Sequence, residues 1–346
     1  MKSPLNQSVL DGLVGGLAAK KNIFGAVFHV SCADGGIDLI SASGGMKPDD
    51  PYYIASINKF IVSAVVLKLC DENRLRLRDK IAPFFPAGGI NGLHVYQGKD
   101  YSGDITIQHL LSLTSGLPCY LVDRQADGKV AMKELEAGQD QPWPIDRVIE
   151  AVKQMKPHFP PSEKGRAYCN DTGHQLLGAV LEKITGRPVS QALNGLFSEL
   201  GMNSTYVCER VTPEEFAPLY YRSKKIQIPN FMNSTQNDMI STARDLMVFL
   251  KAFFNGYFYP KEKLPSLQQW NPIFFPFQYG IGIQKFYTPS WLSPFRAVPE
   301  MIGHCGSTGS VAYYVPQKDV YVTGTINQQA APGIAFQTLA RILQHL

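Results

Sequence analysis

Ser56 and Lys59 are the two residues whose types and spacing best suit covalent chemistry. They stand three positions apart where an apolar helix is expected to begin, so their side chains should share one helical face. The first helical turn would hold the Ser56 hydroxyl near the positive end of the helix dipole, which favours an oxyanion. Burial of Lys59 would lower its pKa, and a neutral lysine can accept the serine proton. The alternative is that Ser56 only caps the helix while Lys59 reaches solvent, because this short pattern often arises by chance.

Tyr168 and Asn170 form a second candidate pair, just before a predicted helix. Alternate residues of an extended segment point the same way, so both side chains would face one site while Cys169 faces another. A phenol beside an ammonium group can relay protons to a leaving group, and an asparagine amide can orient a substrate carbonyl. The alternative is a loop tyrosine followed by a helix cap.

The third candidate is the run His304-Cys305-Gly306-Ser307, which leads into a predicted strand. A glycine beside a strand permits the close approach of a ligand or of another backbone segment. His304 and Gly306 would share one face of this edge, and a backbone N–H near Ser307 would donate to an oxyanion. Taken alone, a histidine in a turn is more often structural.

The elements that would position these residues fall into two groups. Residues near both ends of the chain predict strands at 23–30, 37–42, 279–286, 311–315 and 320–326, with helices at 7–21, 60–69 and 335–346. The segment 60–69 is apolar on all sides, which predicts a helix buried between layers.

The middle of the chain favours capped helices. Pro144, Asp171 and the Thr242-x-x-Asp245 pattern indicate helix starts, and Gly186 indicates a helix end. We therefore predict an α/β domain built from residues 1–80 and 231–346, with a mainly helical domain inserted at 81–230. The active site would lie in the cleft between them, shaped by long loops at 84–104 and 119–141.

Composition excludes several classes of protein. The net charge of +4 is spread without long basic runs, so no nucleic-acid partner is expected. No apolar run reaches the roughly 18 residues that span a membrane. The N-terminus lacks the charge order of a secretory signal, so we expect a cytoplasmic protein, although removal of a leader would leave the same sequence.

The cysteines and histidines point to neither disulfides nor a metal site. The six cysteines contain no C-x-x-C pair, so we expect reduced thiols. The histidines other than His304 show no metal-binding spacing, so no catalytic metal and no cofactor are expected. The chain also lacks the G-x-S-x-G pattern of the α/β-hydrolases.

In their order along the chain, the three candidate motifs resemble those of the penicillin-recognising serine hydrolases. The resemblance is to the branch of class C β-lactamases, D-alanyl-D-alanine carboxypeptidases and family VIII carboxylesterases. It extends from about residue 10 to the C-terminus and includes the flanking segments 105–118, 168–188, 200–207 and 239–256. It implies a β-lactamase/transpeptidase-like fold, with an antiparallel sheet flanked by helices and an inserted, mainly helical region.

The resemblance also implies a role for each candidate residue. Ser56 would be the acylated nucleophile, Lys59 its general base or proton relay, and Tyr168 the partner that protonates the leaving group and activates water. Asn170, His304 and Gly306 would contact substrate, and the backbone N–H groups of Ser56 and Ser307 would form the oxyanion hole.

Two departures from the family pattern affect the expected substrate. Asn58 stands where a serine or threonine is frequent, and Cys305 replaces a hydroxyl residue that helps to bind a substrate carboxylate. We therefore expect a carboxylesterase-like serine hydrolase acting on small esters. The alternatives are an enzyme that cleaves amides, either a β-lactamase or a D-amino-acid peptidase, and a non-enzymatic binding or assembly protein. The loops at 84–104, 119–141 and 257–300 would determine which substrate is bound. The stretch 272–280 is a candidate lining for an acyl pocket. The sequence does not predict the oligomeric state.

Overall fold

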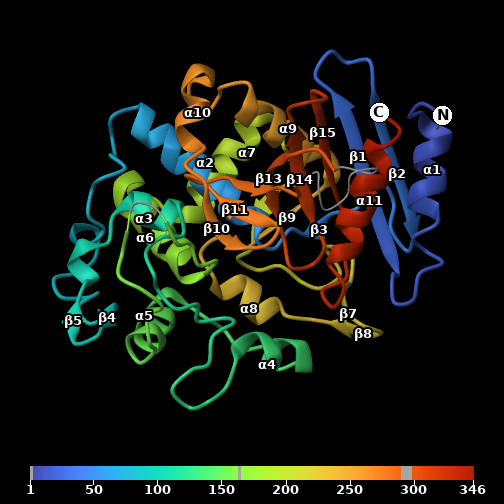
Figure 1. Cartoon of the computed structure of the whole chain (residues 1–346). Helices are drawn as coiled ribbons and strands as arrows, with labels where there is room; N and C mark the ends of the chain where they lie inside the picture. The colour runs from blue at the N-terminus through green and yellow to red at the C-terminus, as the bar shows by residue number, and fades with distance from the viewer. Residues whose placement is uncertain (1–2, 163–164, 290–297) are drawn as a thin grey trace.

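A single eight-stranded sheet joins the two ends of the chain in the computed structural model, which describes residues 3–162, 165–289 and 298–346. Every neighbouring pair of strands is antiparallel. In spatial order the strands are β10 (Asn271–Phe274), β11 (Phe277–Tyr279), β12 (Gln284–Phe286), β13 (Met301–Cys305), β14 (Val311–Val315), β15 (Val320–Thr325), β1 (Gly25–Cys32) and β2 (Asp38–Gly44) (Figure 1). Strand β1 therefore pairs with β15, near the opposite end of the sequence.

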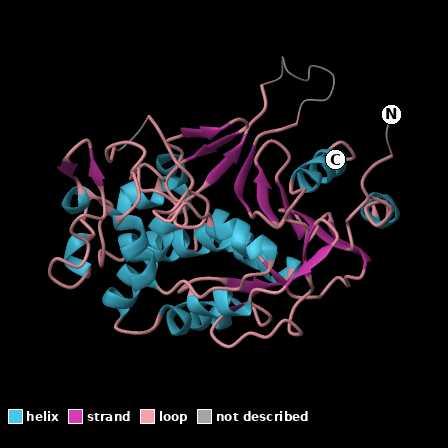
Figure 2. Cartoon of the chain, turned by 90° about the horizontal axis from the view of Figure 1, so that it is seen from below, coloured by secondary structure: helices cyan, strands magenta, loops and turns pink. Residues whose placement is uncertain are grey.

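Helices cover both faces of this sheet. Helices α1 (Gln7–Gly15) and α11 (Gly333–Leu343) pack on one face, and α2 (Ile57–Asp71) and α9 (Ala243–Phe254) pack on the other. Figure 2 shows α1 and α11, near the labelled chain ends, on one side of the strands and the main group of helices on the other. Because both faces are covered, β1 is buried along nearly its whole length, which explains its almost continuous apolar sequence.

Helix α2 lies between the sheet and the helical part of the molecule. It contacts β13 on one side and α6 (Thr172–Thr185) on the other. Eleven of its residues are buried, and they are spread around the whole helix. The prediction of a buried helix after Ser56 is therefore confirmed.

The remaining elements are short. The other helices are α3 (Ile107–Leu111), α4 (Ala131–Ala137), α5 (Ile145–Lys153), α7 (Val189–Leu200), α8 (Pro229–Ser234) and α10 (Leu264–Leu267). A three-stranded sheet contains β3 (Tyr52–Tyr53), β9 (Met239–Ser241) and β6 (Tyr206–Val207), and two hairpins contain β4 (Val95–Tyr96) with β5 (Lys99–Asp100) and β7 (Leu219–Tyr221) with β8 (Lys224–Ile226). Among the described residues, no helix is long and apolar enough to cross a membrane.

Most predicted elements are present in the structure, but several boundaries differ: the helix predicted at 7–21 ends at Gly15, and the predicted loop at 84–104 contains the β4–β5 hairpin. Pro144 precedes α5, the Thr242 side chain caps α9, and Gly186 ends α6 with a positive φ of 68°. The predicted strand at 279–286 is wrong, because Gly282, with φ +75°, sits in a turn that separates β11 from β12. The predicted loop at 119–141 contains α4. All six cysteines are free, as expected, whereas the division into two domains stays a prediction.

Candidate active site

Ser56 and Lys59 meet as their spacing predicts. Ser56 immediately precedes α2, and the Lys59 Nζ atom donates a hydrogen bond to its Oγ atom at 2.8 Å. The lysine side chain is only 1% exposed, so water does not compete for this contact. Ala55, just before Ser56, adopts a φ of +48°, a strained value for a residue with a side chain. The hydroxyl is therefore presented at a sharp turn into a buried helix.

Asp171 completes the group. Its carboxylate forms an ion pair with Lys59 Nζ, the atom that also donates to Ser56 Oγ. Burial is the largest single influence on Lys59 and by itself lowers its pKa, but the surrounding groups, with the charge and hydrogen bond of Asp171 foremost, together raise it. The sequence-based expectation of a lowered lysine pKa is thus wrong, because the counter-charge was not foreseen. In this arrangement Lys59 is an ammonium group and Ser56 Oγ is its acceptor.

Side chains alternate in direction along the segment before α6, as predicted, but Cys169 and Asp171, rather than Asn170, face the site. Asp171 faces Lys59, and Cys169, two residues earlier, lines the same cavity as Ser56 and interacts electrostatically with Lys59. Asn170 is 1% exposed: its Oδ1 atom accepts from the Gly173 N–H at 2.7 Å, and its Nδ2 atom donates to the Tyr168 carbonyl. Asn170 therefore caps α6, the role predicted for Asp171, and it does not line the cavity.

Tyr168 is held away from the lysine. Its hydroxyl donates to Asp123, whose other carboxylate oxygen lies 2.9 Å from Nε2 of His158. The rings of His158 and Tyr168 pack with centroids 3.7 Å apart. Burial, reinforced by Asp123, raises the pKa of Tyr168, so the phenol keeps its proton. The edge of Tyr168 still borders the cavity, but its hydroxyl does not make the contact with Lys59 that a proton relay requires.

His304 is a neutral, fully buried side chain. Burial, followed by the nearby charge of Lys59, lowers its pKa to about 3. Its Nδ1 atom lies 2.8 Å from the Cys305 carbonyl oxygen, an acceptor, so Nδ1 carries the hydrogen. Its Nε2 atom then accepts from the Tyr279 hydroxyl at 3.2 Å. His304 lines the cavity, and its contacts give it the role of a fixed polar wall.

Gly306 brings the end of β13 against the segment that carries Ser56. A Cβ atom at this position would lie 2.6 Å from the Ile54 carbonyl oxygen and 2.3 Å from Ser310 Oγ. The Ser310 hydroxyl in turn donates to the Ile54 carbonyl at 2.7 Å. Gly306 is therefore required so that the protein's own segments can pack together. The prediction from the sequence was different, namely that the missing side chain makes room for substrate.

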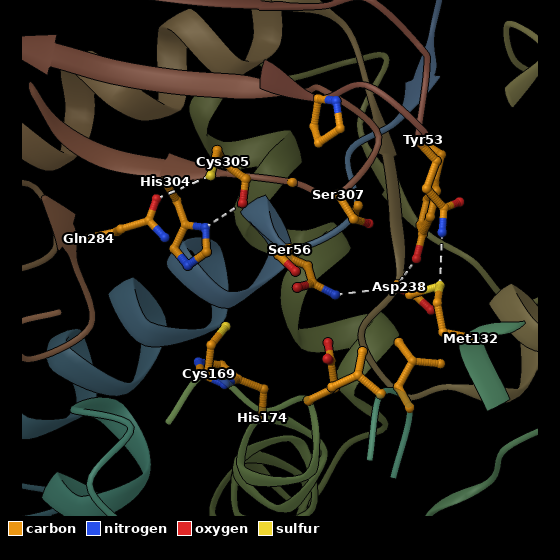
Figure 3. Close-up of a pocket in the computed structure, with 18 of the residues that line it drawn as sticks. Tyr53, Ser56, Met132, Cys169, His174, Asp238, Gln284, His304, Cys305 and Ser307 are labelled. Atoms are coloured by element: carbon orange, nitrogen blue, oxygen red, sulfur yellow. Dashed lines mark hydrogen bonds between the residues drawn. The ribbon is translucent and has the colours of Figure 1, made fainter. Parts of the chain in front are cut away.

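This packing sets Ser307 opposite Ser56, as Figure 3 shows. Ser307 is exposed and lines the cavity together with Ser56. Within the described part of the chain, neither backbone N–H group donates a hydrogen bond to another protein atom. Both are therefore available to an oxyanion formed at the Ser56 acyl carbon.

The cavity above Ser56 has a volume of about 800 Å³ and a mostly apolar lining. Part of the stretch 272–280 lines it, namely Ile273, Phe274, Pro276 and Phe277, as does the 119–141 segment through residues that include Tyr120 and Met132. The predicted contribution of the 84–104 loop is wrong. Its residues Phe84, Phe85 and Pro86 border a separate depression beside α5. Residues 290–297 of the 257–300 loop lie outside the described residues.

Comparison with protein families identifies the chain. The profile of the Beta-lactamase family matches residues 10–346, nearly the entire sequence. The protein belongs to the beta-lactamase family. This family membership agrees with the antiparallel sheet, the flanking helices and the resemblance of the three motifs.

Within the beta-lactamase family, the chain is similar to proteins with different names. It is 27% identical over 182 residues to esterase EstB of Burkholderia gladioli, covering 51% of this chain and 43% of that protein. It is 29% identical over 240 residues to penicillin-binding protein 4* of Bacillus subtilis (strain 168), covering 64% of this chain and 49% of that protein. The chain thus spans about half the length of these two relatives. The D-amino acid amidase of Ochrobactrum anthropi SV3 superposes with a TM-score of 0.79 at 20% identity, over 98% of each chain.

Three residues at the cavity of this beta-lactamase family member are not predicted as site residues from the sequence. The sequence predicts Asp171 as a helix cap and Cys169 on the opposite face, and it gives no prediction for Asp238. The Asp238 carboxyl group lies at the cavity wall and is only 5% exposed. An isolated acidic residue such as Asp238 does not indicate a site by its sequence context. Cys169 and Asp171 could have been predicted, because side chains alternate along an extended segment, and the choice that turns Tyr168 and Asn170 away from the site turns Cys169 and Asp171 toward Lys59.

Proposed function

We propose that this protein is a serine hydrolase that cleaves small carboxylic esters through an acyl-enzyme on Ser56. The single observation that carries the proposal is the 2.8 Å contact between Lys59 Nζ and Ser56 Oγ at the base of the apolar cavity. A cavity of about 800 Å³ falls in the size range of small-molecule sites.

Acylation in this site begins from the ion pair. As Ser56 Oγ attacks the ester carbon, its proton passes to Lys59, which at the same time gives a proton to Asp171. The oxyanion accepts hydrogen bonds from the N–H groups of Ser56 and Ser307. When the tetrahedral intermediate collapses, the C–O bond to the alcohol breaks, Lys59 gives a proton to the alkoxide, and Asp171 returns its proton to Lys59. Water then attacks the acyl-enzyme and passes a proton to Lys59 and on to Asp171; as the bond from the acyl carbon to Ser56 Oγ breaks, Lys59 protonates Oγ and Asp171 again returns its proton.

The lining of the cavity favours esters without a carboxylate. None of the described residues that line it is a lysine or an arginine, and Lys59 behind it is already paired with Asp171. A carboxylate such as that of a penicillin or a D-Ala-D-Ala peptide would therefore enter without a cationic partner. The similarity to an esterase, EstB, supports the same choice of substrate.

A panel of p-nitrophenyl esters of increasing acyl length tests the proposal. The wild-type protein should hydrolyse at least one ester, and the Ser56→Ala variant should lose this activity by at least 1,000-fold. Ser63→Ala is the matched control, since Ser63 is buried on the same helix and does not line the cavity. No activity above the Ser56→Ala variant on any chain length would refute the ester proposal.

Two further measurements separate the rival functions. A penicillin or D-Ala-D-Ala adduct on Ser56, found by mass spectrometry, would favour an amide substrate. Failure of a fluorophosphonate probe to label Ser56 would favour a binding protein. The cytoplasmic location expected from the sequence belongs to the same proposal, and fractionation of cells that produce the protein tests it.

A further inference from the structure

Asp238 is a buried acid that the hydrolytic mechanism does not use. It precedes β9 and lines the same cavity as Ser56. Its Oδ1 atom accepts hydrogen bonds from the Tyr53 hydroxyl at 2.8 Å and from Asn58 Nδ2 at 3.2 Å, and its Oδ2 atom accepts from the Thr235 hydroxyl at 2.6 Å. A carboxylate has about four acceptor positions, so one remains open. Figure 3 shows Asp238 beside Tyr53 at the wall of the cavity that contains Ser56.

Asn58 contributes an unpaired acceptor to the same wall. Its Nδ2 atom donates to Asp238 and to the Asn237 carbonyl oxygen at 3.1 Å, which fixes the orientation of the amide. The Oδ1 atom is thereby turned away from both acceptors and has no hydrogen-bond partner, although the residue is only 6% exposed. A buried amide oxygen without a donor is rare and costly in folded proteins. Asn58 lines the cavity, and its two hydrogen bonds hold the Asp238 carboxylate and the Asn237 backbone in place at the cavity wall.

The charges around the cavity do not balance. Asp171 is neutralised by Lys59, whereas Asp238 receives hydrogen bonds only from uncharged groups. Burial raises the pKa of Asp238 to about 6, so the group is still ionised at neutral pH. Burial also lowers the pKa values of His174 and His304, which line the cavity as neutral rings. The described lining therefore carries one uncompensated negative charge and an unpaired acceptor next to it.

We propose that the cavity binds the ammonium group of an amine-bearing acyl substrate at the Asp238 carboxylate, which Tyr53, Asn58 and Thr235 hold in place. An ammonium group brings a positive charge and hydrogen-bond donors, which match the charge of Asp238 and its open acceptor position. The amine belongs to the acyl part, because the acyl group stays bonded to Ser56 in both half-reactions and Asn58 lies on the same first turn of α2. This inference rests on the proposed ester hydrolysis and names the class of ester.

Matched p-nitrophenyl esters test it directly, with spontaneous hydrolysis subtracted. The 3-aminopropanoate and 6-aminohexanoate esters are compared at pH 7.5 with the butanoate and heptanoate esters, in which a methyl group replaces the ammonium group. We expect kcat/KM to be at least tenfold higher for the amine at one or both lengths. The hydrogen pimelate ester, with a carboxylate at the same place as the longer amine, should react more slowly than the heptanoate ester.

Variants test which residues cause the preference for the amine. Asp238→Asn should reduce the amine-to-methyl ratio of kcat/KM to about 1. If that variant does not fold, Asn58→Leu takes its place, and it should also reduce the ratio. Asp245→Asn is the control, since that carboxylate binds Ser204 and Thr205 outside the cavity; the ratio should stay as in the wild type. A ratio of 1 or less at both lengths, with the neutral esters turned over, overturns the amine site alone. If no ester is turned over, the proposed hydrolysis fails and the amine site fails with it.

Discussion

Asp171 forms an ion pair with Lys59, and the same Lys59 Nζ atom donates a hydrogen bond to the hydroxyl of Ser56. The lysine side chain is 1% exposed and the aspartate side chain 27% exposed, so the pair is shielded from bulk water mainly on the lysine side. The pair holds Lys59 as an ammonium group in the resting site, because Asp171 raises the pKa that burial would otherwise lower. In the proposed mechanism, activation of Ser56 therefore depends on Asp171 as the final proton acceptor.

Replacing Asp171 with asparagine should weaken both stability and activity. The substitution leaves a buried lysine without its counter-charge, and breaking such a pair costs about 3 kcal/mol. It also removes the final proton acceptor, so acylation of Ser56 should slow by 100-fold or more. Urea denaturation at pH 7 and the burst of p-nitrophenol measure the two effects.

A double-variant cycle checks that the loss comes from the pair. Lys59→Met combined with Asp171→Asn removes both charges, so the double variant should be more stable than the sum of the two single losses predicts, by about 2 kcal/mol. Strictly additive losses in the free energy of unfolding would contradict the coupling.

Tyr168→Phe should leave catalysis nearly intact. The lost hydroxyl binds Asp123, so the expected effect is a loss of about 1–2 kcal/mol in the free energy of unfolding. We expect kcat/KM on esters to change by less than threefold. A fall of 100-fold or more in kcat with unchanged folding would restore Tyr168 as the proton relay that the family resemblance implies.

Modification of Cys169 should block the site. Methyl methanethiosulfonate adds a methylthio group to a thiol, and at Cys169 this group would project into the cavity that contains Ser56. Because burial raises the pKa of Cys169, the rate of inactivation should still increase between pH 8 and pH 9.5. Labelling of Ser56 by a fluorophosphonate measures the block. Cys169→Ala should resist the reagent and Cys70→Ala should not; equal sensitivity of both variants would show that another thiol is responsible.

Asp238 makes the stability of the protein depend on pH in a specific direction. Its pKa in the folded state is raised from 3.8 to about 6, so folding favours the protonated form. The contribution to stability is fully present below about pH 3.8 and is lost as the pH rises through about 6. Between pH 4.5 and 7.5 the wild type should therefore lose about 2 kcal/mol of unfolding free energy relative to Asp238→Asn. Urea titrations of both proteins at the two pH values measure the change, and a constant difference would contradict it.

The sequence predicts the contact between Ser56 and Lys59 well because both residues lie at the start of one helix. Helical spacing fixes their relation regardless of the rest of the fold, and the structure brings them together. Much of the sheet can also be predicted from the sequence, since strands such as 311–315 and 320–325 are rich in β-branched and aromatic residues and are separated by a short turn. The turn at Gly282 was missed because an alternating pattern on both sides of two glycines also fits one long strand.

The residues around the nucleophile are harder to predict because they depend on tertiary contacts. In an extended segment the sequence gives two possible phases, and only the position of Lys59 selects Cys169 and Asp171 over Tyr168 and Asn170. The pKa of Lys59 has the same origin, because its sign depends on a charge 112 positions away in the chain. The electrostatic character of the site is thus a property of the assembled fold.

The pairing of β1 with β15 determines when the molecule can assemble during its synthesis. Once the ribosome has released β1 and β2, the edge of β1 that later pairs with β15 stays unpaired until the strands at 311–325 emerge. At about 5–20 residues per second, the interval is roughly 15 to 60 s. Throughout it the apolar edge of β1 needs protection from other chains, so folding in the cell should depend on chaperones that bind nascent polypeptides near residues 25–32.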